Sequence, residues 1–324
     1  MRPASGLNNR QLTAGDLDNL PQPEWLVDDL LPRGSLAVVL GKPGVGKTFF
    51  ALNLGLCVAT GEDFAGRWIR KSKVLYIAAE GARGLAVRKN AWLELYGRQD
   101  LDGIRFLPGA VNLVDPVASR ELQQLVRDEE YDLVIIDTLS RSMPGADENS
   151  PKDMTTVVEA VDGIRGSISD QRTVVVLHHP VKDTNKVRGH GSLEGAIDTT
   201  ICVSKGPTAQ LRITCPKQKE FPEFEEFRLE LRPIGESCAI GQAAQDGNLS
   251  ISRQQIVTLV QGDRTRWWNG PELHEASGLG RSTFYSQLKV LVETAIVEKE
   301  GDRSNARYRL ADRSPASPIE SSPI

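Results

Sequence analysis

The sequence predicts an α/β core with a mostly parallel sheet and an antiparallel edge, followed by a small C-terminal winged-helix domain. Three observations predict this class. A glycine-rich loop stands between an apolar run and a helical pattern over residues 35–56. Further short apolar runs over 73–80, 131–138 and 173–179 are typical of buried strands. The last runs of the core follow one another closely without helices between them, so we expect them to be antiparallel.

The glycine-rich loop fits G-x-x-x-x-G-K-[ST], the pattern of phosphate-binding loops. Glycines let the backbone curl so that several N–H groups point at anionic oxygens. Lys47 supplies a positive charge for the β- and γ-phosphates, and the Thr48 hydroxyl can bind Mg²⁺. The helix that follows directs its N-terminal dipole at phosphate. The predicted ATP-binding residues are Gly41, Lys42, Pro43, Gly44, Val45, Gly46, Lys47, Thr48 and Phe49.

Composition limits the class of protein. Of 324 residues, 40% are hydrophobic and 25% are charged, which fits one large and one small globular domain. No apolar run approaches the roughly 20 residues of a membrane helix, and no signal-peptide core follows Met1. The cysteines lie far apart, which favours burial over disulfides or zinc. We expect a cytoplasmic protein with no membrane partner. Its net charge of −4 confines nucleic-acid contacts to local patches.

The chain divides into a core and a small C-terminal unit. Residues 1–22 are polar with Gly and Pro and predict a flexible N-terminal arm, and the core covers 23–234. A helix is expected from about residue 85 to 95. The predicted strands after the phosphate loop are 73–80, 131–138, 173–179, 199–204, 210–215 and 227–232.

The segment after the core changes composition twice. Residues 235–250 are rich in Gly, Ala, Gln and Asn and predict a linker. Residues 251–311 have the pattern of a helix, a helix–turn–helix and a hairpin, in the order of a winged helix-turn-helix. The Ser/Pro-rich segment 312–324 predicts a disordered tail.

Two acidic positions distinguish among the classes of P-loop protein. Asp137 ends an apolar run and resembles a Walker B acid, which holds Mg²⁺ through water. AAA+ ATPases carry a glutamate directly after that acid, and Thr138 stands there instead. Glu80 ends the strand after the phosphate loop, where RecA-like ATPases keep the carboxylate that polarises the attacking water.

From Trp25 to about Arg232 the chain resembles the RepA-like branch of the RecA-fold replicative helicases, the AAA_25 group. The matching segments are 31–35, the phosphate loop, 59–61, 76–81, 135–138, 178–179 and 188–192. The resemblance implies a RecA-like P-loop ATPase core that uses ATP and Mg²⁺. It also implies a homo-oligomeric ring, usually a hexamer, with ATP between subunits. The winged helix adds site-specific DNA docking, which suggests replication of a phage, plasmid or mobile element.

The resemblance also implies roles for individual residues. Catalytic roles are implied for Lys47, Glu80, His178, His179, Arg188, Lys217 and Lys219. His178 or His179 would sense the γ-phosphate at a strand end. Arg188 is similar in place to an arginine finger that acts on a neighbour's ATP. Lys217 or Lys219 looks like the K-x-K strand end that also reaches a neighbour. A solvated basic loop is the alternative for these last residues.

Two regions are predicted to bind DNA. A single strand in the ring would pass Lys182 and Lys186. Duplex DNA would meet the presumed recognition helix and the hairpin tip, whose residues combine hydrogen-bonding and basic side chains. These residues are Arg281, Ser282, Thr283, Gln287, Arg303 and Arg307. The charge of the unit is nearly balanced, so a protein docking site is the alternative.

Two other functions remain open. Partition ATPases of the ParA/MinD type have the loop K-G-G-x-G-K-T, which differs from residues 42–48 at one glycine. They also place an aspartate two or three residues before a proline after the Walker B strand, whereas the first proline here is Pro144. The second alternative is a nucleotide-gated DNA-binding regulator, in which ATP sets assembly and no strand is separated.

Overall fold

The computed structural model describes most of the chain. The described residues are 13–15, 24–99, 101–167, 170–181, 187, 189–206, 209–241, 251–263, 266–293, 296–301 and 305–311. Most of the predicted arm at 1–22 lies outside these residues, and so does the predicted tail at 312–324. Across the described ranges, no helix combines the length and the apolar character that crossing a membrane requires.

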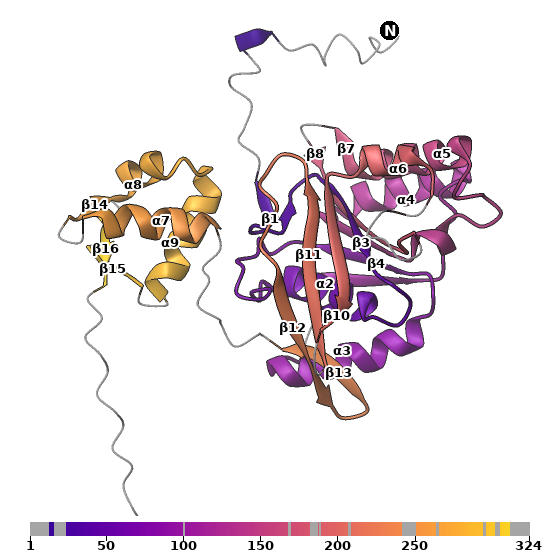
Figure 1. Ribbon diagram of the computed structural model, residues 1–324, viewed down its shortest axis with the longest axis horizontal. Coiled ribbons are helices and arrows are strands. Elements are labelled where there is room, and N and C mark those ends of the chain that lie inside the picture. Colours follow the sequence, from indigo (N-terminus) through magenta and orange to yellow (C-terminus); the bar gives the residue numbers. More distant parts are fainter. Residues whose placement is uncertain are drawn as a thin grey trace, which may run out of the picture.

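A nine-stranded sheet organises the core, with the order β13-β12-β11-β10-β3-β9-β6-β4-β5 (Figure 1). Its strands are β3 (Leu36–Leu40), β4 (Val74–Ala78), β5 (Ile104–Pro108), β6 (Leu133–Asp137), β9 (Thr173–His178), β10 (Thr199–Lys205), β11 (Gln210–Gln218), β12 (Phe227–Ile234) and β13 (Ser237–Gly241). The six strands from β10 to β5 are parallel, and β11, β12 and β13 add an antiparallel edge. The mostly parallel α/β sheet that the sequence predicts is confirmed.

The core sheet extends further along the chain than the sequence predicts. β13 lies inside the segment 235–250, which we expected to be a linker, and it pairs with β12 through Gly241. Ala239 and Ile240 are buried there against the apolar layer of the core. The linker prediction is therefore wrong for residues 237–241, because a short strand can be buried with few large side chains. Residues 242–250 lie outside the described part of the chain.

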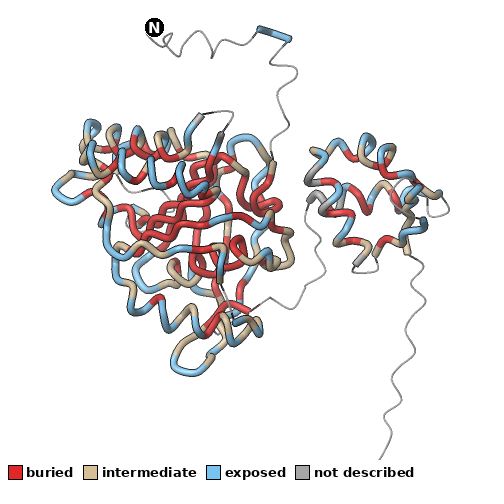
Figure 2. Tube along the Cα trace, turned by 180° about the vertical axis from the view of Figure 1, so that it is seen from behind, coloured by how far each residue is buried: buried red, intermediate tan, exposed pale blue. Residues whose placement is uncertain are grey.

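Helices cover both faces of the sheet. One apolar layer lies under α2 (Lys47–Thr60) and α3 (Ala82–Tyr96), which contains the helix predicted near 85–95. The other lies under α4 (Pro116–Asp128), α5 (Pro151–Arg165) and α6 (Gly191–Ala196). Figure 2 shows the buried residues concentrated in the strands between these helices. Short elements are β1 (Trp25–Val27), β2 (Leu31–Pro32), η2 (Leu139–Ser142), β7 (Gly166–Ser167) and β8 (Asp170–Gln171).

The C-terminal elements have an apolar cluster of their own. They are α7 (Ile251–Gly262), β14 (Trp268–Asn269), α8 (Gly270–Ser277), α9 (Arg281–Glu293), β15 (Val297–Glu300) and β16 (Arg307–Leu310). The strands form an antiparallel sheet in the order β14-β16-β15. Ile256, Phe284 and Leu291 are fully buried in the cluster. β14 is an addition to the elements that the sequence predicts.

The turn between β1 and β2 buries two acids beside the first strand of the core. Asp28 is 0% exposed and Asp29 is 6% exposed. Burial raises the pKa of Asp29 from 3.8 to about 7, and the Arg67 guanidinium opposes that shift. The Arg67 Nη2 lies 3.9 Å from the Asp29 Oδ2. Asp29 has φ 59°, in the left-handed region that asparagine also tolerates.

Replacing Asp29 with Asn should stabilise the protein more at pH 8 than at pH 5. The native state keeps the proton to about pH 7, whereas the unfolded chain loses it near 3.8. Between these pH values the unfolded chain binds fewer protons than the native state, so the native protein loses stability as pH rises. The gain should be about 3 kcal/mol larger at pH 8, measured by urea unfolding. The exposed Asp102→Asn variant is the control. An equal effect of Asp29→Asn at both pH values would contradict the shift.

Candidate active site

The phosphate loop joins β3 to α2 and is shaped by its glycines. Gly44 and Gly46 have φ of 72° and 108°, which L side chains rarely adopt. A Cβ on Gly41 would stand 2.5 Å from the backbone oxygen of Val203 on β10. The loop therefore curls tightly between neighbouring strands, as a backbone nest for phosphate must.

Lys47 closes the loop from the first turn of α2. Its Nζ donates to the backbone oxygens of Gly41 at 2.8 Å and Lys42 at 3.2 Å. Burial lowers the pKa of Lys47 from its ordinary value, and the carboxylates of Asp137 and Glu80 act in the opposite direction. Lys47 is 7% exposed. A charge held so near a nest of N–H groups is suited to the phosphates of a nucleotide.

The two predicted acids meet beside this lysine because β4 and β6 are neighbours. Ala78 lies opposite Asp137, and the amide of Ala79 donates to the Asp137 backbone oxygen at 2.8 Å. Glu80 follows two residues after the end of β4, and its Oε1 accepts from the Thr138 hydroxyl at 2.9 Å. The parallel register thus brings Lys47, Asp137 and Glu80 to one edge of the sheet.

Asp137 has the surroundings of a magnesium ligand. It is 4% exposed, and its Oδ1 accepts no hydrogen bond from the described residues. Burial raises the pKa of Asp137 above its ordinary value, while the hydroxyls of Tyr76 and Thr48 act in the opposite direction. Mg²⁺ prefers hard oxygen ligands: the Thr48 hydroxyl could bind the ion directly, and the Asp137 carboxylate could hold it through water. These residues fit the metal that the phosphate loop implies.

The adjacent histidines occupy different environments. His178 ends β9 opposite Leu40 and is 1% exposed. His179 is half-buried, and its Nδ1 lies 3.4 Å from the Lys47 Nζ. His179, one of the two histidines predicted to sense the γ-phosphate, thus contacts the lysine of the phosphate loop. Among the described residues, no group of three or more His, Cys, Asp and Glu side chains is placed to hold a metal.

Lys217 and Lys219 lie at the opposite edge of the sheet from the phosphate loop. Lys217 pairs with Thr200 near the start of β10, and its Nζ donates to the Glu194 backbone oxygen at 2.7 Å. Lys219 is exposed and its Nζ is 3.7 Å from Asp198 Oδ1. Because β10 runs parallel to β3, its start is remote from the loop that follows β3. Both lysines therefore lie away from the phosphate loop of the same chain.

The predicted DNA-binding residues are only partly described. Lys182, Lys186 and Arg303 lie outside the described residues, as do the side chains of Ser282 and Thr283. Arg188, the predicted arginine finger, also lies outside them. Arg281 begins α9 and is exposed, and Arg307 is exposed on β16. These two positions are available to a partner.

The prediction that Gln287 reads bases is wrong for this conformation. Gln287 is 0% exposed, and its Oε1 accepts from the Arg253 Nε at 2.7 Å. It lies three residues after Phe284, and helix periodicity puts both on the face that packs against the C-terminal cluster. Arg253 also donates to the backbone oxygen of Gly66 in the core. A polar residue on a predicted helix face is not necessarily exposed.

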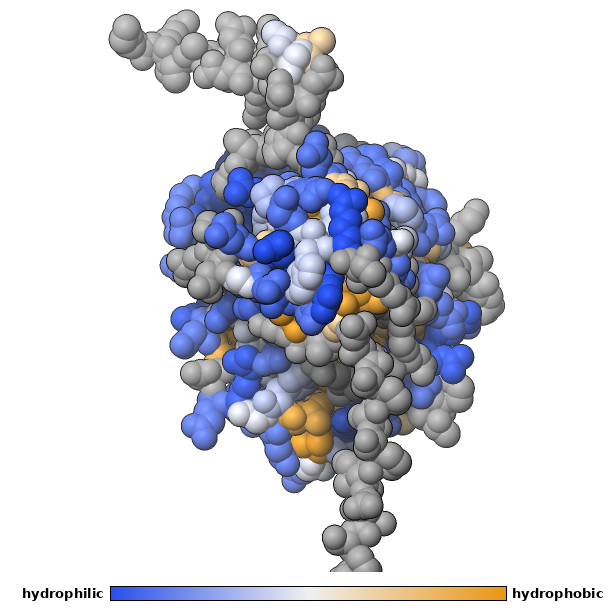
Figure 3. All heavy atoms as spheres, turned by 90° about the vertical axis from the view of Figure 1, so that its left-hand side faces the viewer, coloured by the Kyte–Doolittle hydropathy of each residue, from blue (hydrophilic) through white to orange (hydrophobic). Residues whose placement is uncertain are grey.

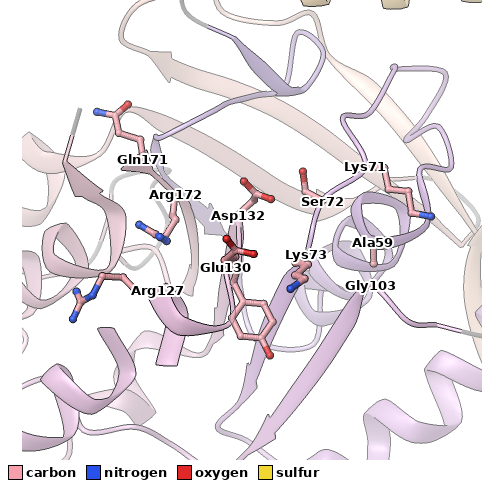
Figure 4. A pocket seen from close by; sticks show the side chains of 11 residues that line it. Ala59, Lys71, Ser72, Lys73, Gly103, Arg127, Glu130, Asp132, Gln171 and Arg172 are labelled. Carbon is pink, nitrogen blue, oxygen red and sulfur yellow. The ribbon is translucent and has the colours of Figure 1, made fainter. Parts of the chain in front are cut away.

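A cavity of about 770 Å³ lies at the other edge of the sheet (Figure 4). Its lining includes Lys71 and Lys73 before β4, Asp132 before β6 and Arg172 before β9. No residue of the phosphate loop lines it. The amino ends of the parallel strands form this cavity, so it is separate from the candidate nucleotide site.

Two residues of the site were missed by the sequence prediction. The Tyr76 hydroxyl donates to Asp137 Oδ2 at 2.7 Å, and Thr138 donates to Glu80. Both contacts cross from β4 to β6, which are far apart in the chain. The alternation of side chains along each strand is visible in the sequence, but the order of the strands is not.

Comparison with known proteins agrees with this geometry. A family of AAA domains, AAA_25, matches residues 3–185. The matched segment contains Lys47, Glu80, Asp137 and both histidines, and it stops before β10. A search of the curated proteins finds no match. The match covers more than half of the 324 residues, and the chain therefore belongs to the AAA domain family AAA_25, which consists of P-loop ATPases.

Proposed function

We propose that this protein is an ATP-dependent, DNA-translocating ATPase, a helicase of the RepA type that acts in replication of a phage, plasmid or mobile element. The observation that carries the proposal is the meeting of Lys47, Asp137 and Glu80 at one edge of a parallel sheet. Thr138 in place of a second Walker B acid supports a RecA-like ATPase over an AAA+ ATPase. In the proposed assembly, a ring (usually a hexamer) holds ATP between subunits.

The chemistry follows from the positions of these side chains. The β- and γ-phosphates of ATP would lie in the loop against Lys47, and bound Mg²⁺ would neutralise part of their charge. Glu80 would accept a proton from the water that attacks the γ-phosphate. The Thr138 hydroxyl donates to one oxygen of Glu80 and so restricts the orientation of that carboxylate. His179 would respond to the γ-phosphate, which its position beside Lys47 supports.

Replacing Glu80 with Gln should leave ATP binding intact and lower turnover by about 100-fold or more, because an amide cannot accept the proton. Phosphate release measures turnover, and a fluorescent ATP analogue measures binding. Glu94→Gln, an exposed change on α3, is the control. Normal turnover in Glu80→Gln would move the base to another residue.

The helicase and the DNA-binding regulator differ in strand separation. Both should hydrolyse ATP, but only a helicase should release the labelled strand of a forked duplex in an ATP-dependent way. Hydrolysis without release, at protein concentrations where the ring is assembled, would favour the regulator. An assembly of two subunits on ATP would instead favour a partition ATPase.

Lys219 should act on the ATP of a neighbouring subunit. Since it is remote from its own phosphate loop, Lys219→Ala protein should bind ATP yet turn it over slowly. Mixing it with Glu80→Gln protein should restore part of the activity, because some interfaces regain both groups. Lys73→Ala, an exposed lysine at the same edge of the sheet, is the control. No recovery at any ratio, with subunit exchange shown separately, would refute action in trans.

We further propose that residues 251–311 form a winged helix that binds duplex DNA. The support is the order of α7, α8, α9 and the β15–β16 hairpin, with exposed Arg281 and Arg307 on two of these elements. Hydrophilic side chains dominate the face on which these elements lie (Figure 3). Ion pairs of Arg309 with Glu298 and of Arg266 with Glu272 neutralise part of the charge, so the contact with DNA would be local.

Replacing Arg307 with Ala in the full chain should weaken duplex binding similarly for all sequences, because the expected contact is to phosphate. The logarithm of the association constant falls linearly with the logarithm of the salt concentration, and this slope should become less steep by about 1. Fluorescence anisotropy at several salt concentrations measures the affinity and the slope. Arg228→Ala, which changes an exposed residue on β12, is the control. Unchanged binding and slope would favour the alternative in which this unit docks a protein.

A further inference from the structure

A buried tyrosine holds the carboxylate of the candidate magnesium site. Tyr76 lies two residues before the end of β4 and is 0% exposed. Its hydroxyl donates to Asp137 Oδ2 at 2.7 Å. Tyr76 pairs with Ile135 on β6, so Tyr76, Ile135 and Asp137 share one face of the sheet. That face packs against α2, the helix that begins in the phosphate loop.

The Asp137 carboxylate uses its two oxygens differently. Oδ2 accepts from Tyr76, whereas Oδ1 is buried and within hydrogen-bond geometry of no donor in the described residues, although the Thr48 hydroxyl is near enough to oppose the rise in the pKa of Asp137. Buried polar atoms are nearly always hydrogen-bonded, so this oxygen is open to a partner that protein atoms do not supply, such as a water molecule or a metal ion with its bound water. Thr48, the other predicted magnesium ligand, lies on the same side of the sheet in the first turn of α2.

The tyrosine ring has little room to move. Its centroid is 5.7 Å from that of Phe106 on β5, and it belongs to the apolar layer that contains Val74 and Ile135. A ring confined in this way presents its hydroxyl at a fixed point. The hydrogen bond therefore restricts rotation of the Asp137 side chain about its last torsion.

We propose that Tyr76 is a positioning residue for the magnesium site, and that its hydroxyl holds Oδ2 of Asp137 so that Oδ1 stays available to the metal beside Thr48. This inference rests on the proposed nucleotide site. Residues that hydrogen-bond to metal ligands orient them, and removing such a partner typically costs about 10- to 100-fold in metal affinity. A purely structural tyrosine would instead affect stability and leave metal binding unchanged.

The test compares Mn²⁺ binding to the ADP complexes of the native protein and of Tyr76→Phe. Mn²⁺ replaces Mg²⁺ because electron paramagnetic resonance reports its free concentration and its surroundings directly. The Phe variant keeps the ring and removes one oxygen. We expect its Mn²⁺ dissociation constant to rise about 10-fold, with metal-free ADP binding unchanged. Tyr96→Phe, which removes a hydroxyl bonded to the Ile240 backbone oxygen at 3.3 Å, should match the native protein.

Three outcomes separate the hypotheses. A Mn²⁺ dissociation constant for Tyr76→Phe within twofold of the native value would overturn the positioning role. An equal loss in Tyr96→Phe would also overturn it, because the effect would then be general. If the native protein binds neither ADP nor ATP, the proposed nucleotide site itself fails.

A second measurement uses the native sequence and so does not depend on folding of the Tyr76 variant. The chain has five tyrosines, and fluorotyrosine labelling gives each a ¹⁹F resonance. Tyr-to-Phe changes at the other four positions assign the Tyr76 signal by elimination. That signal should shift when Mg²⁺ is added to the ADP complex, because its acceptor is then a metal-associated carboxylate. A signal that stays in place while Mg²⁺ tightens ADP binding would contradict the inference.

Discussion

The parallel register of β3, β9, β6 and β4 is the constraint on which the candidate site depends. Each strand ends at the same edge of the sheet, and each is followed by one part of the site. The phosphate loop follows β3, His178 ends β9, Asp137 ends β6 and Glu80 follows β4. Ligands of open α/β sheets bind outside the carboxyl ends of the strands, and this arrangement is an example. Residues far apart in the chain thus meet without any long-range motif in the sequence.

Burial of charge gives this edge its chemical character. Lys47 and Asp137 are both at least nine-tenths buried. Desolvation favours the neutral form of each side chain, so it lowers the pKa of Lys47 and raises the pKa of Asp137. Their mutual attraction and the hydrogen bonds from backbone and hydroxyl groups oppose this cost. A phosphate and its magnesium ion would supply the missing charges. The site therefore suits an anionic ligand that carries a bound cation. Magnesium nucleotides, on which P-loop ATPases act, are ligands of this kind.

The sequence predicts this site well because its residues are adjacent to recognisable strand ends. It predicts less well wherever strand order or burial decides. Tyr76 was missed because nothing in the sequence shows that β4 lies beside β6. The polar side chain of Gln287 on a predicted helix suggests exposure, but helix packing buries it against Arg253. β13 was missed because its few large side chains resemble a linker.

The central claim is that the loop from Gly41 to Thr48 binds a nucleotide, with Lys47 as the charge that holds its phosphates. Equilibrium binding of a fluorescent ATP analogue to native protein and to Lys47→Ala tests this claim most directly. The account predicts magnesium-dependent binding by the native protein and a loss of about 100-fold or more in the variant, since removing the partner of a phosphate charge costs several kcal/mol. Equal affinity in the two proteins, or no binding by either, would contradict it.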